Sequence, residues 1–423
     1  MQSMELVKSP KECCGCGACA LRCPKGAITM QENREGFFYP KIEKHLCIDC
    51  GSCLRVCGFR NGERIESFQE TYAACARDGD WRQSASGGLF AGLAQAVLDK
   101  GGAVFGCAMV YEEGRLIPKH LCVREKRELT WLKGSKYVQS RLGNIYTEVQ
   151  ESLQEADSVF FCGTPCQIVG LRSYLQKRYD NLFTAELVCH GVPSAKLFQD
   201  YIASVEKKEK KKVIDFRFRD KSQGWRLYGS MVLSEENGRE TKKFFEPEDS
   251  SYYQLFLKGD TYRESCYHCP FASVYRSGDI TIGDYWGIDL EHPEYLTKNG
   301  GALEEQKGIS CLIVNNEQGR RLLEKYGQKI DRYQSSYEKA ARYNGQLLHA
   351  CDRTKERDTV MALAGQGYEQ VEKWYQRRRI RSRIQRKLRS MVPGKVKYGI
   401  RKLDKWCRER KKYAKGECNR TGI

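Results

Sequence analysis

The chain has 423 residues, a formal net charge of +18 at pH 7 and 21 cysteines. The length is enough for two or three domains, and no stretch approaches the roughly 20 apolar residues that a membrane-spanning helix needs. Residues 1–11 lack the apolar segment of a secretory signal, so we expect a cytoplasmic protein whose thiols stay reduced.

Two runs of four cysteines dominate residues 1–66. Both runs have the spacing Cys-x2-Cys-x2-Cys-x3-Cys, which is typical of a ferredoxin module with two [4Fe-4S] clusters. Three thiolates on a tight turn can wrap three corners of a cube, and the fourth corner must then be reached from the other run. The spacing therefore predicts one cluster held by Cys13, Cys16, Cys19 and Cys57 and another held by Cys47, Cys50, Cys53 and Cys23.

Zinc and disulfides are the alternatives for these runs, and the pattern favours neither. A zinc site usually takes two separated pairs of ligands, whereas a triple plus one occurs here twice. Disulfides need an oxidising compartment, which nothing else in the chain indicates. Cys14 falls outside the spacing, and we expect it to point away from the clusters.

From Tyr72 onward the pattern is that of an α/β protein, with apolar strands that alternate with helices. A loop rich in Ser and Gly precedes the first helix, and a second α/β portion begins near residue 150. The expected strands are 72–76, 103–111, 158–161, 187–189 and 280–282, the expected helices are 89–100 and 168–177, and a turn is expected at 162–166.

Four further cysteines stand in tight loops or at the ends of expected strands: Cys166, Cys189, Cys266 and Cys269. Loops of this kind gather at the carboxyl edge of an α/β sheet, where the four thiols could converge. The residues alone leave three interpretations open, namely a third [4Fe-4S] cluster, a zinc site, or small buried side chains.

Four segments stand out in this part of the chain: 84–90 (SASGGLF), 132–140 (LKGSKYVQS), 163–167 (GTPCQ) and 279–287 (DITIGDYWG). They resemble signature segments of the family of coenzyme F420 hydrogenase/dehydrogenase beta subunits, and the resemblance covers about residues 70–350. It implies a flavoprotein scaffold that carries FAD beside a [4Fe-4S] cluster, with Cys166, Cys189, Cys266 and Cys269 as the ligands of that cluster. The implied fold is an α+β ferredoxin-like dicluster module fused to an α/β flavoprotein domain, followed by a basic helical tail. The ferredoxin module is expected at residues 1–66 and the basic tail at 351–423. Between them, 67–150 and 151–350 are expected to be the N-terminal and C-terminal parts of the flavoprotein domain, which is the domain like the F420 hydrogenase beta subunit.

The flavin prediction has its own physical basis. Small residues and free N–H groups before the helix at 89–100 suit a pyrophosphate at the helix's positive end, although a Ser cap with a glycine turn explains them too. The segment at 133–137 offers cations and an aromatic ring, or else forms a solvated basic loop. With the resemblance, the predicted FAD-binding residues are Ser84, Ser86, Gly87, Gly88, Lys133, Gly134, Ser135, Lys136, Tyr137 and Thr164. His190 is a candidate proton donor, with a structural histidine as the alternative.

The positive charge is concentrated near the C-terminus, where residues 372–423 contain 20 Lys and Arg against 4 acidic residues. Two basic helices with narrow apolar stripes are expected there, separated by Pro393-Gly394. Such helices suit an anionic membrane surface, for example the inner face of the cell membrane, or an acidic partner, or a solvated tail; nucleic acid is less favoured.

Together these features predict an FAD- and iron–sulfur-dependent oxidoreductase that exchanges electrons with a donor or acceptor protein and an unidentified substrate. A non-catalytic electron-transfer subunit and a binding protein tethered to a ferredoxin are the alternatives.

Overall fold

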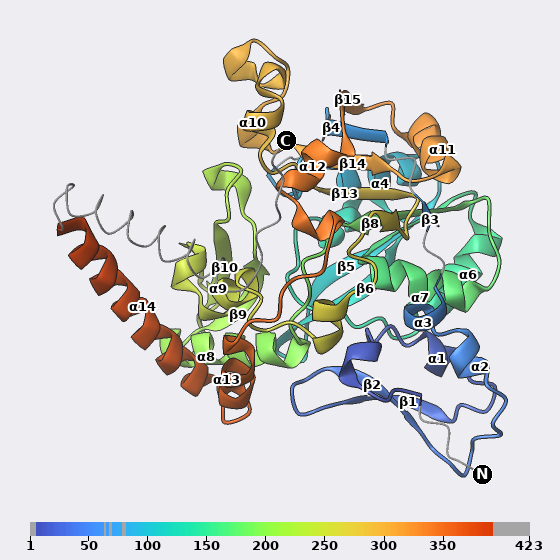
Figure 1. Cartoon of the computed structure of the whole chain (residues 1–423), viewed down its shortest axis with the longest axis horizontal. Coiled ribbons are helices and arrows are strands. Elements are labelled where there is room, and N and C mark those ends of the chain that lie inside the picture. Colours follow the sequence, from blue (N-terminus) through green and yellow to red (C-terminus); the bar gives the residue numbers. More distant parts are fainter. Residues whose placement is uncertain (1–5, 63–64, 67–69, 78–81, 392–423) are drawn as a thin grey trace, which may run out of the picture. The chain divides into compact units, whose positions relative to one another are not determined.

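The computed structural model describes residues 6–62, 65–66, 70–77 and 82–391 (Figure 1). It divides into two compact units, Met1–Glu369 and Gln370–Ile423. No helix among the described residues is both long enough and apolar enough to cross a membrane.

The N-terminal module consists of a hairpin and three short helices. Strand β1 (Ile28–Glu32) pairs antiparallel with β2 (Phe38–Ile42), and the helices are α1 (Ala18–Leu21), α2 (Ser52–Arg55) and α3 (Gly58–Asn61). Gly17 and Gly51 cap α1 and α2 with φ of +75° and +70°, a conformation that glycine adopts without strain. Each cap directly follows a cysteine, so both cysteine runs make the same tight turn.

The body of the first unit is a mixed sheet of eight strands in the order β15-β4-β14-β13-β8-β7-β5-β6. Neighbours from β5 through β7 and β8 to β13 are parallel, and the remaining pairs are antiparallel. The strands are β4 (Glu70–Ala76), β5 (Ala103–Glu112), β6 (Arg115–Val123), β7 (Val159–Gly163), β8 (Leu182–Leu187), β13 (Ile280–Asp284), β14 (Ser310–Val314) and β15 (Ile330–Ser335). Strands from residues 67–150 and 151–350 thus lie side by side in one sheet.

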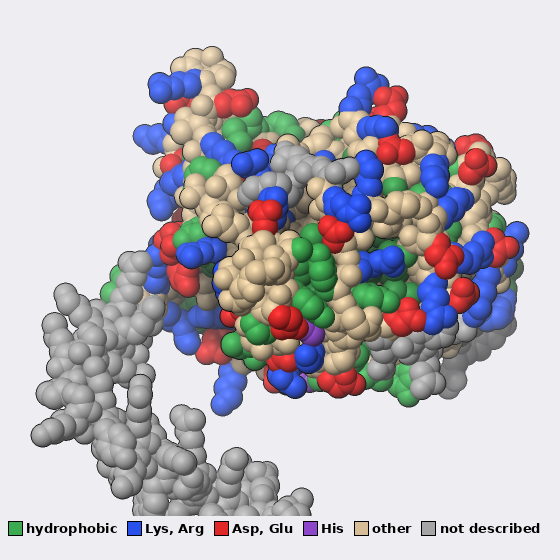
Figure 2. All heavy atoms as spheres, turned by 90° about the horizontal axis from the view of Figure 1, so that it is seen from above, with side chains coloured by type: hydrophobic (Ala, Val, Ile, Leu, Met, Phe, Trp, Pro, Cys, Tyr) green, Lys and Arg blue, Asp and Glu red, His purple; other side chains and the backbone are tan. Residues whose placement is uncertain are grey.

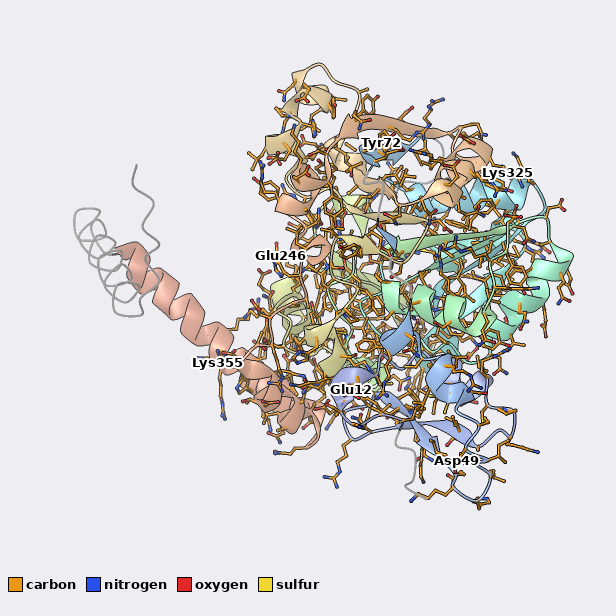
Figure 3. The ribbon with its side chains drawn as sticks, turned by 45° about the vertical axis from the view of Figure 1, so that its right-hand side comes forward. Glu12, Asp49, Tyr72, Glu246, Lys325 and Lys355 are labelled. Carbon is orange, nitrogen blue, oxygen red and sulfur yellow. The ribbon has the colours of Figure 1, made fainter. Side chains whose placement is uncertain are left out.

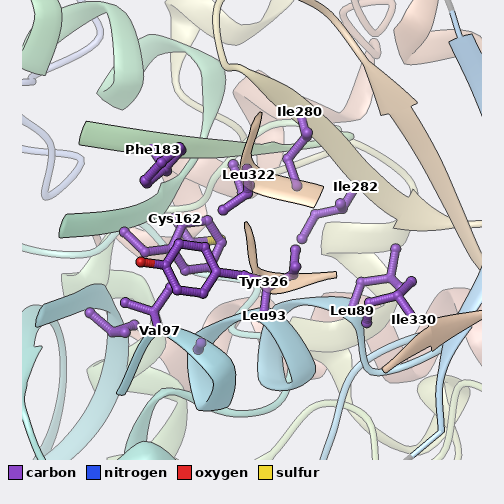
Figure 4. Packing of buried hydrophobic residues seen from close by; sticks show 14 of the residues in the cluster. Leu89, Leu93, Val97, Cys162, Phe183, Ile280, Ile282, Leu322, Tyr326 and Ile330 are labelled. Atoms are coloured by element: carbon purple, nitrogen blue, oxygen red, sulfur yellow. The ribbon is translucent and has the colours of Figure 1, made fainter. Parts of the chain in front are cut away.

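Both faces of this sheet are covered, because successive strand residues point to opposite faces. Phe160 packs with α4 (Leu89–Asp99) and α11 (Glu317–Tyr326) on one face, where Leu93, Val97 and Tyr326 meet (Figure 4). Its neighbour Phe161 packs on the other face with α6 (Ile145–Glu155) and α7 (Pro165–Leu175). Helix α12 (Tyr337–Arg342) covers the β4–β14 end of that second face.

Smaller elements surround the sheet. A three-stranded antiparallel sheet has the order β11-β10-β9, and β12 pairs with β3. Their bounds are β3 (Ile65–Glu66), β9 (Lys212–Arg217), β10 (Gly229–Ser234), β11 (Glu240–Phe245) and β12 (Tyr275–Arg276), and the remaining helices are α5 (Leu129–Leu132), α8 (Ala195–Glu209), α9 (Ser251–Leu257), α10 (Ile288–Glu291), α13 (Glu356–Ala364) and α14 (Tyr368–Met391).

Two local predictions are wrong. The strand expected at 187–189 lies earlier in the chain, since β8 runs from Leu182 to Leu187. The sequence pattern misplaced it because Glu186 interrupts the apolar run, although its side chain is fully buried in an ion pair with Arg276. The turn expected at 162–166 is much shorter, since Gly163 ends β7 and Pro165 begins α7.

The beginning of the tail also differs from its prediction. Residues 351–369 lie in the first unit, where Arg357 of α13 pairs with Glu35 at 2.7 Å and with Glu264 at 2.9 Å. Helix α14 runs to Met391, and the second expected basic helix lies outside the described residues. On the face in Figure 2, basic and acidic side chains are interspersed, in keeping with a charge excess that belongs to the tail sequence.

Candidate functional site

The structure brings together the four cysteines expected to hold the first cluster, here named set one (Cys13, Cys16, Cys19 and Cys57). Burial raises the pKa of Cys19, and the nearby thiols of Cys16, Cys13 and Cys57 raise it further. The N–H of Gly15 donates to Cys13 Sγ at 3.3 Å, the kind of contact that tunes cluster sulfurs.

Set one rests on helix α7. A Cβ on Gly170 would lie 3.1 Å from Cys16 Sγ and 2.6 Å from the Tyr146 hydroxyl, so only glycine leaves room for this loop. Gly170 is one helical turn beyond Cys166, and residues at that spacing share a helix face. The N-terminal module and the start of α7 are therefore in direct contact.

Set two (Cys23, Cys47, Cys50 and Cys53) surrounds a small hollow of about 20 Å³ that is closed by Ile28, Ile42 and Ile48 among others. Cys50 is exposed, and Asp49 lies toward the outer end of the module (Figure 3). Each set thus takes three thiols from one run and one from the other, with Cys57 and Cys23 crossing over.

Set three (Cys166, Cys189, Cys266 and Cys269) gathers from three separate loops. Cys166 lies in the first turn of α7, Cys189 follows β8, and the other two lie in the short 3-10 helix Glu264–His268 and just after it. Burial raises the pKa of Cys266 to about 12, with the nearby Cys166 and Cys269 thiols contributing. All four thiols line one large cavity.

Cys14 does not point away, and that prediction is wrong. Its side chain is buried, and hydrogen bonds to the thiols of Cys16 and Cys166, together with burial, raise its pKa. The same contact lowers the pKa of Cys166 to about 7 despite burial. Cys14 therefore connects set one with set three.

Among the described residues, no three or more His, Cys, Asp or Glu side chains converge closely enough to hold a single metal ion. A tetrahedral zinc site needs four ligands, with thiolates about 2.3 Å from the metal.

The cavity beside set three has a volume of about 430 Å³, within the range of small-molecule sites. The N-terminus of α4 opens into it, as do residues 132–140 and the turn between β7 and α7. Of the predicted FAD-binding residues, the structure places nine on its wall: Ser84, Ser86, Gly88, Lys133, Gly134, Ser135, Lys136, Tyr137 and Thr164.

Gly87 is the exception, because it faces the sheet. Its N–H donates to Ser310 Oγ at 2.8 Å, and a Cβ there would lie 2.5 Å from the carbonyl oxygen of Ala74. Gly87 therefore allows the loop to approach β4 and β14, and it offers no free donor to a pyrophosphate. Gly88, with φ of +79°, is the N-cap of α4 and does line the cavity.

Lys136 and Tyr137 contribute differently to the wall. Burial lowers the pKa of Lys136 to about 8, and its ammonium donates to the carbonyls of Lys133 and Trp131 at 2.6 and 3.2 Å. The Tyr137 ring stacks on Phe256 at 4.4 Å, so one ring face is covered within the protein.

A hydrogen-bonded chain that the sequence did not reveal orients the start of α7. His120 Nε2 donates to the Cys162 carbonyl at 3.3 Å, which leaves Nδ1 to accept from Ser140 Oγ at 2.8 Å. Ser140 Oγ accepts from Gln167 Nε2, whose Oε1 accepts from the N–H of Thr164, each at 2.9 Å. The chain joins residues 132–140 to the turn that carries Cys166.

Asp284 and Trp286 also line the cavity, and Asp284 forms an ion pair with the buried Arg219. Arg219 contacts Asp284 at 2.9 Å and lies over the ring of Trp286, which in turn stacks on Trp225 at 5.4 Å. His190 also lines the cavity, and burial lowers its pKa while the charge of Asp284 opposes this effect.

Two segments of the chain match known protein families. Residues 12–61 match the 4Fe-4S dicluster domain, and residues 156–334 match the family described as the C terminus of the coenzyme F420 hydrogenase/dehydrogenase beta subunit. The matched regions show that the chain is similar to these families in two parts, a dicluster segment followed by a segment like the C terminus of the beta subunits. The predicted resemblance is thereby confirmed.

Two curated relatives match part of the chain. An F(420)H(2) dehydrogenase subunit of Methanosarcina mazei is 24% identical over 167 residues, which are 37% of this chain and 46% of that protein. Coenzyme F420-dependent sulfite reductase of Methanocaldococcus jannaschii is 28% identical over 187 residues, 43% of this chain and 28% of that protein. The chain therefore spans less than half the length of each.

Among solved structures, a chain of the F420-reducing [NiFe] hydrogenase complex from Methanosarcina barkeri matches 72% of this chain and 95% of its own length. The identity is 15% and the TM-score 0.42, and neither value supports a conclusion about function.

Proposed function

We propose that this chain is an iron–sulfur flavoprotein oxidoreductase that moves electrons between a partner protein and a substrate in the large cavity. The observation that supports this most directly is the position of set three. Its thiols line the same cavity as the N-terminus of α4, and Cys14 links it to set one. Electrons would then pass between the two N-terminal clusters, a third cluster at set three and a bound flavin.

The residues present fit three cubes. Each set supplies four thiols, the number that a [4Fe-4S] cluster requires, and the exposed Cys50 makes set two the natural point of electron exchange with a partner. Sets one and three are more deeply buried, which suits centres that pass electrons onward inside the protein.

The cavity fits FAD at its phosphate end. The first N–H groups of a helix have no partner within the helix, and those of α4 open into the cavity behind Gly88. Lys133 lies on the same wall and supplies a positive charge. A flavin bound there would supply the exchange between single electrons and the two-electron chemistry of an organic substrate.

The remaining residues hold this arrangement and handle protons. Ser140 and Gln167 fix the turn that carries Cys166, and Lys136 brings an amine to the wall of the cavity. His190 is the proposed proton donor. We expect His190→Gln to slow substrate turnover without changing iron or flavin content, which separates proton transfer from cofactor binding.

The test is anaerobic purification of the full chain with iron, sulfide and flavin quantified. We expect about twelve irons per chain and one non-covalent FAD that is released on heating. An iron content of about eight per chain would contradict the third cluster. A folded, iron-loaded protein that neither carries nor binds FAD would contradict the flavoprotein assignment.

A non-catalytic electron-transfer subunit is the second candidate. It is favoured by the name of one relative, which is a dehydrogenase subunit. An FAD-loaded chain that reduces no small acceptor, the deazaflavin F420 included, until a partner protein is added would support this alternative. Turnover by the isolated chain would support the oxidoreductase.

For the tail we propose attachment to anionic lipid. Residues 372–423 carry a net charge of +16, and each Lys or Arg near such a surface contributes roughly 1 kcal/mol within a Debye length. Full-length protein should sediment with anionic vesicles at low salt and detach as salt rises, whereas a chain ending at Glu369 should keep its cofactors and stay in solution. Equal sedimentation of both chains would contradict the proposal.

A further inference from the structure

Arg263 is a buried cation at the contact between sets one and three. Its side chain is among the largest that are fully buried, with 1% exposure. It precedes Cys266 by three residues, and its guanidinium reaches the backbone of the N-terminal module. Nε donates to the Cys13 carbonyl at 2.7 Å, and Nη2 donates to the Phe38 carbonyl at 2.8 Å.

The other neighbours of Arg263 are neutral. Nη1 lies 3.4 Å from Gln139 Oε1, and the guanidinium carbon is 4.1 Å from the centre of the Tyr39 ring. Gln139 also donates to the Cys14 carbonyl at 2.9 Å, so the amide joins Arg263 to the link between the sets. Within the described part of the chain, no carboxylate forms an ion pair with Arg263.

A buried charge without a counter-charge is strongly destabilising. The guanidinium contacts the backbone of Cys13 in set one, and Arg263 stands three residues before Cys266 in set three, so its charge lies between the two sets. The negative groups that suit this cation are therefore the thiolate-bound clusters at these two sets.

We propose that Arg263 raises the reduction potentials of the clusters at sets one and three relative to that at set two, and so directs electrons inward. Reduction of a cluster adds one electron and no proton, so the added negative charge is stabilised by a nearby fixed cation. At set two the corresponding cation, Arg55, is exposed and donates to the Cys50 carbonyl, where water screens its charge. This inference rests on the proposed three-cluster path and names a positioning residue within it.

The test is a reductive titration of the anaerobically purified full chain, followed by electron paramagnetic resonance. Arg263→Gln should make reduction at sets one and three at least about tenfold less favourable, a negative shift of about 59 mV for one electron, and leave set two unchanged. Arg263→Lys keeps the positive charge, so its reduction potentials at sets one and three should stay close to those of the wild type. Arg55→Gln is the matched control and should leave sets one and three unchanged.

A second pair of variants retains Arg263, in case its loss prevents folding. Gln139→Glu places a carboxylate against the guanidinium and should shift the same two potentials in the negative direction, whereas the uncharged Gln139→Met should shift them much less. Unchanged potentials in Arg263→Gln or Gln139→Glu with full iron content would overturn the proposal. A shift at only one of the two sets would overturn the claim that Arg263 serves both. Iron content is scored separately, so a missing third cluster is distinguished from a missing electrostatic effect.

Discussion

Replacing Cys269 with Ser is expected to lower the iron content from about twelve to about eight per chain. The clusters at sets one and two should remain, because none of their thiols comes from this loop, and FAD should stay bound. Reduction of the flavin by a one-electron donor that enters at set two should then slow steeply, since the centre beside the cavity is missing.

Cys107→Ser is the matched control for this prediction. Cys107 also lines the cavity but belongs to none of the three sets, so its loss should leave the iron content unchanged. Iron and sulfide analysis with flavin absorbance measures both variants. An unchanged iron content in Cys269→Ser would contradict the assignment of a cluster to set three.

The second large effect is expected at His120, as a dependence of stability on pH. Burial lowers the pKa of His120 to about 4, whereas in the unfolded chain it is near 6.5. The folded state therefore favours the neutral ring, and the stability this provides is present above pH 6.5 and lost as the pH falls toward 4. The difference corresponds to roughly 3 kcal/mol.

Protonation has a structural consequence at the same site. It places a second N–H against Ser140 Oγ, which already accepts from Gln167, so the chain of hydrogen bonds behind Cys166 is disturbed. His120→Leu should lower the free energy of unfolding at pH 7 by about 1–3 kcal/mol and remove this part of the acid sensitivity. His349→Leu, at an exposed site, is the control; denaturant unfolding from pH 7 to 4 measures all three proteins. If the free energy of unfolding falls equally between pH 7 and 4 in His120→Leu and in the wild type, the role given to His120 is contradicted.

The features that the sequence could predict are those with a local pattern. The cysteine spacing predicted which thiols lie together in sets one and two, because a repeated turn brings each triple together. The strand, loop and helix at 70–99 were predicted because their apolar periodicity is clear. The wall residues at 132–140 were found through the resemblance to a family.

The features that were missed depend on contacts between distant segments. Cys14 has no spacing partner, and its role comes from the approach of α7 to the N-terminal module. His120 and Arg263 each act on residues far away in the sequence, and no nearby residue marks them. Gly87 was assigned to the cofactor because its loop has the right composition. Its contacts with β4 and β14 instead make it face the sheet, which the sequence did not reveal.

The most direct measurement of the central claim is an anaerobic titration of the purified chain with a one-electron reductant, in which the electrons taken up are counted. Three clusters that accept one electron each and a flavin that accepts two predict about five electrons per chain, with the flavin absorbance bleached at the end. Uptake of about two electrons by a fully folded chain, with no flavin signal, would contradict it.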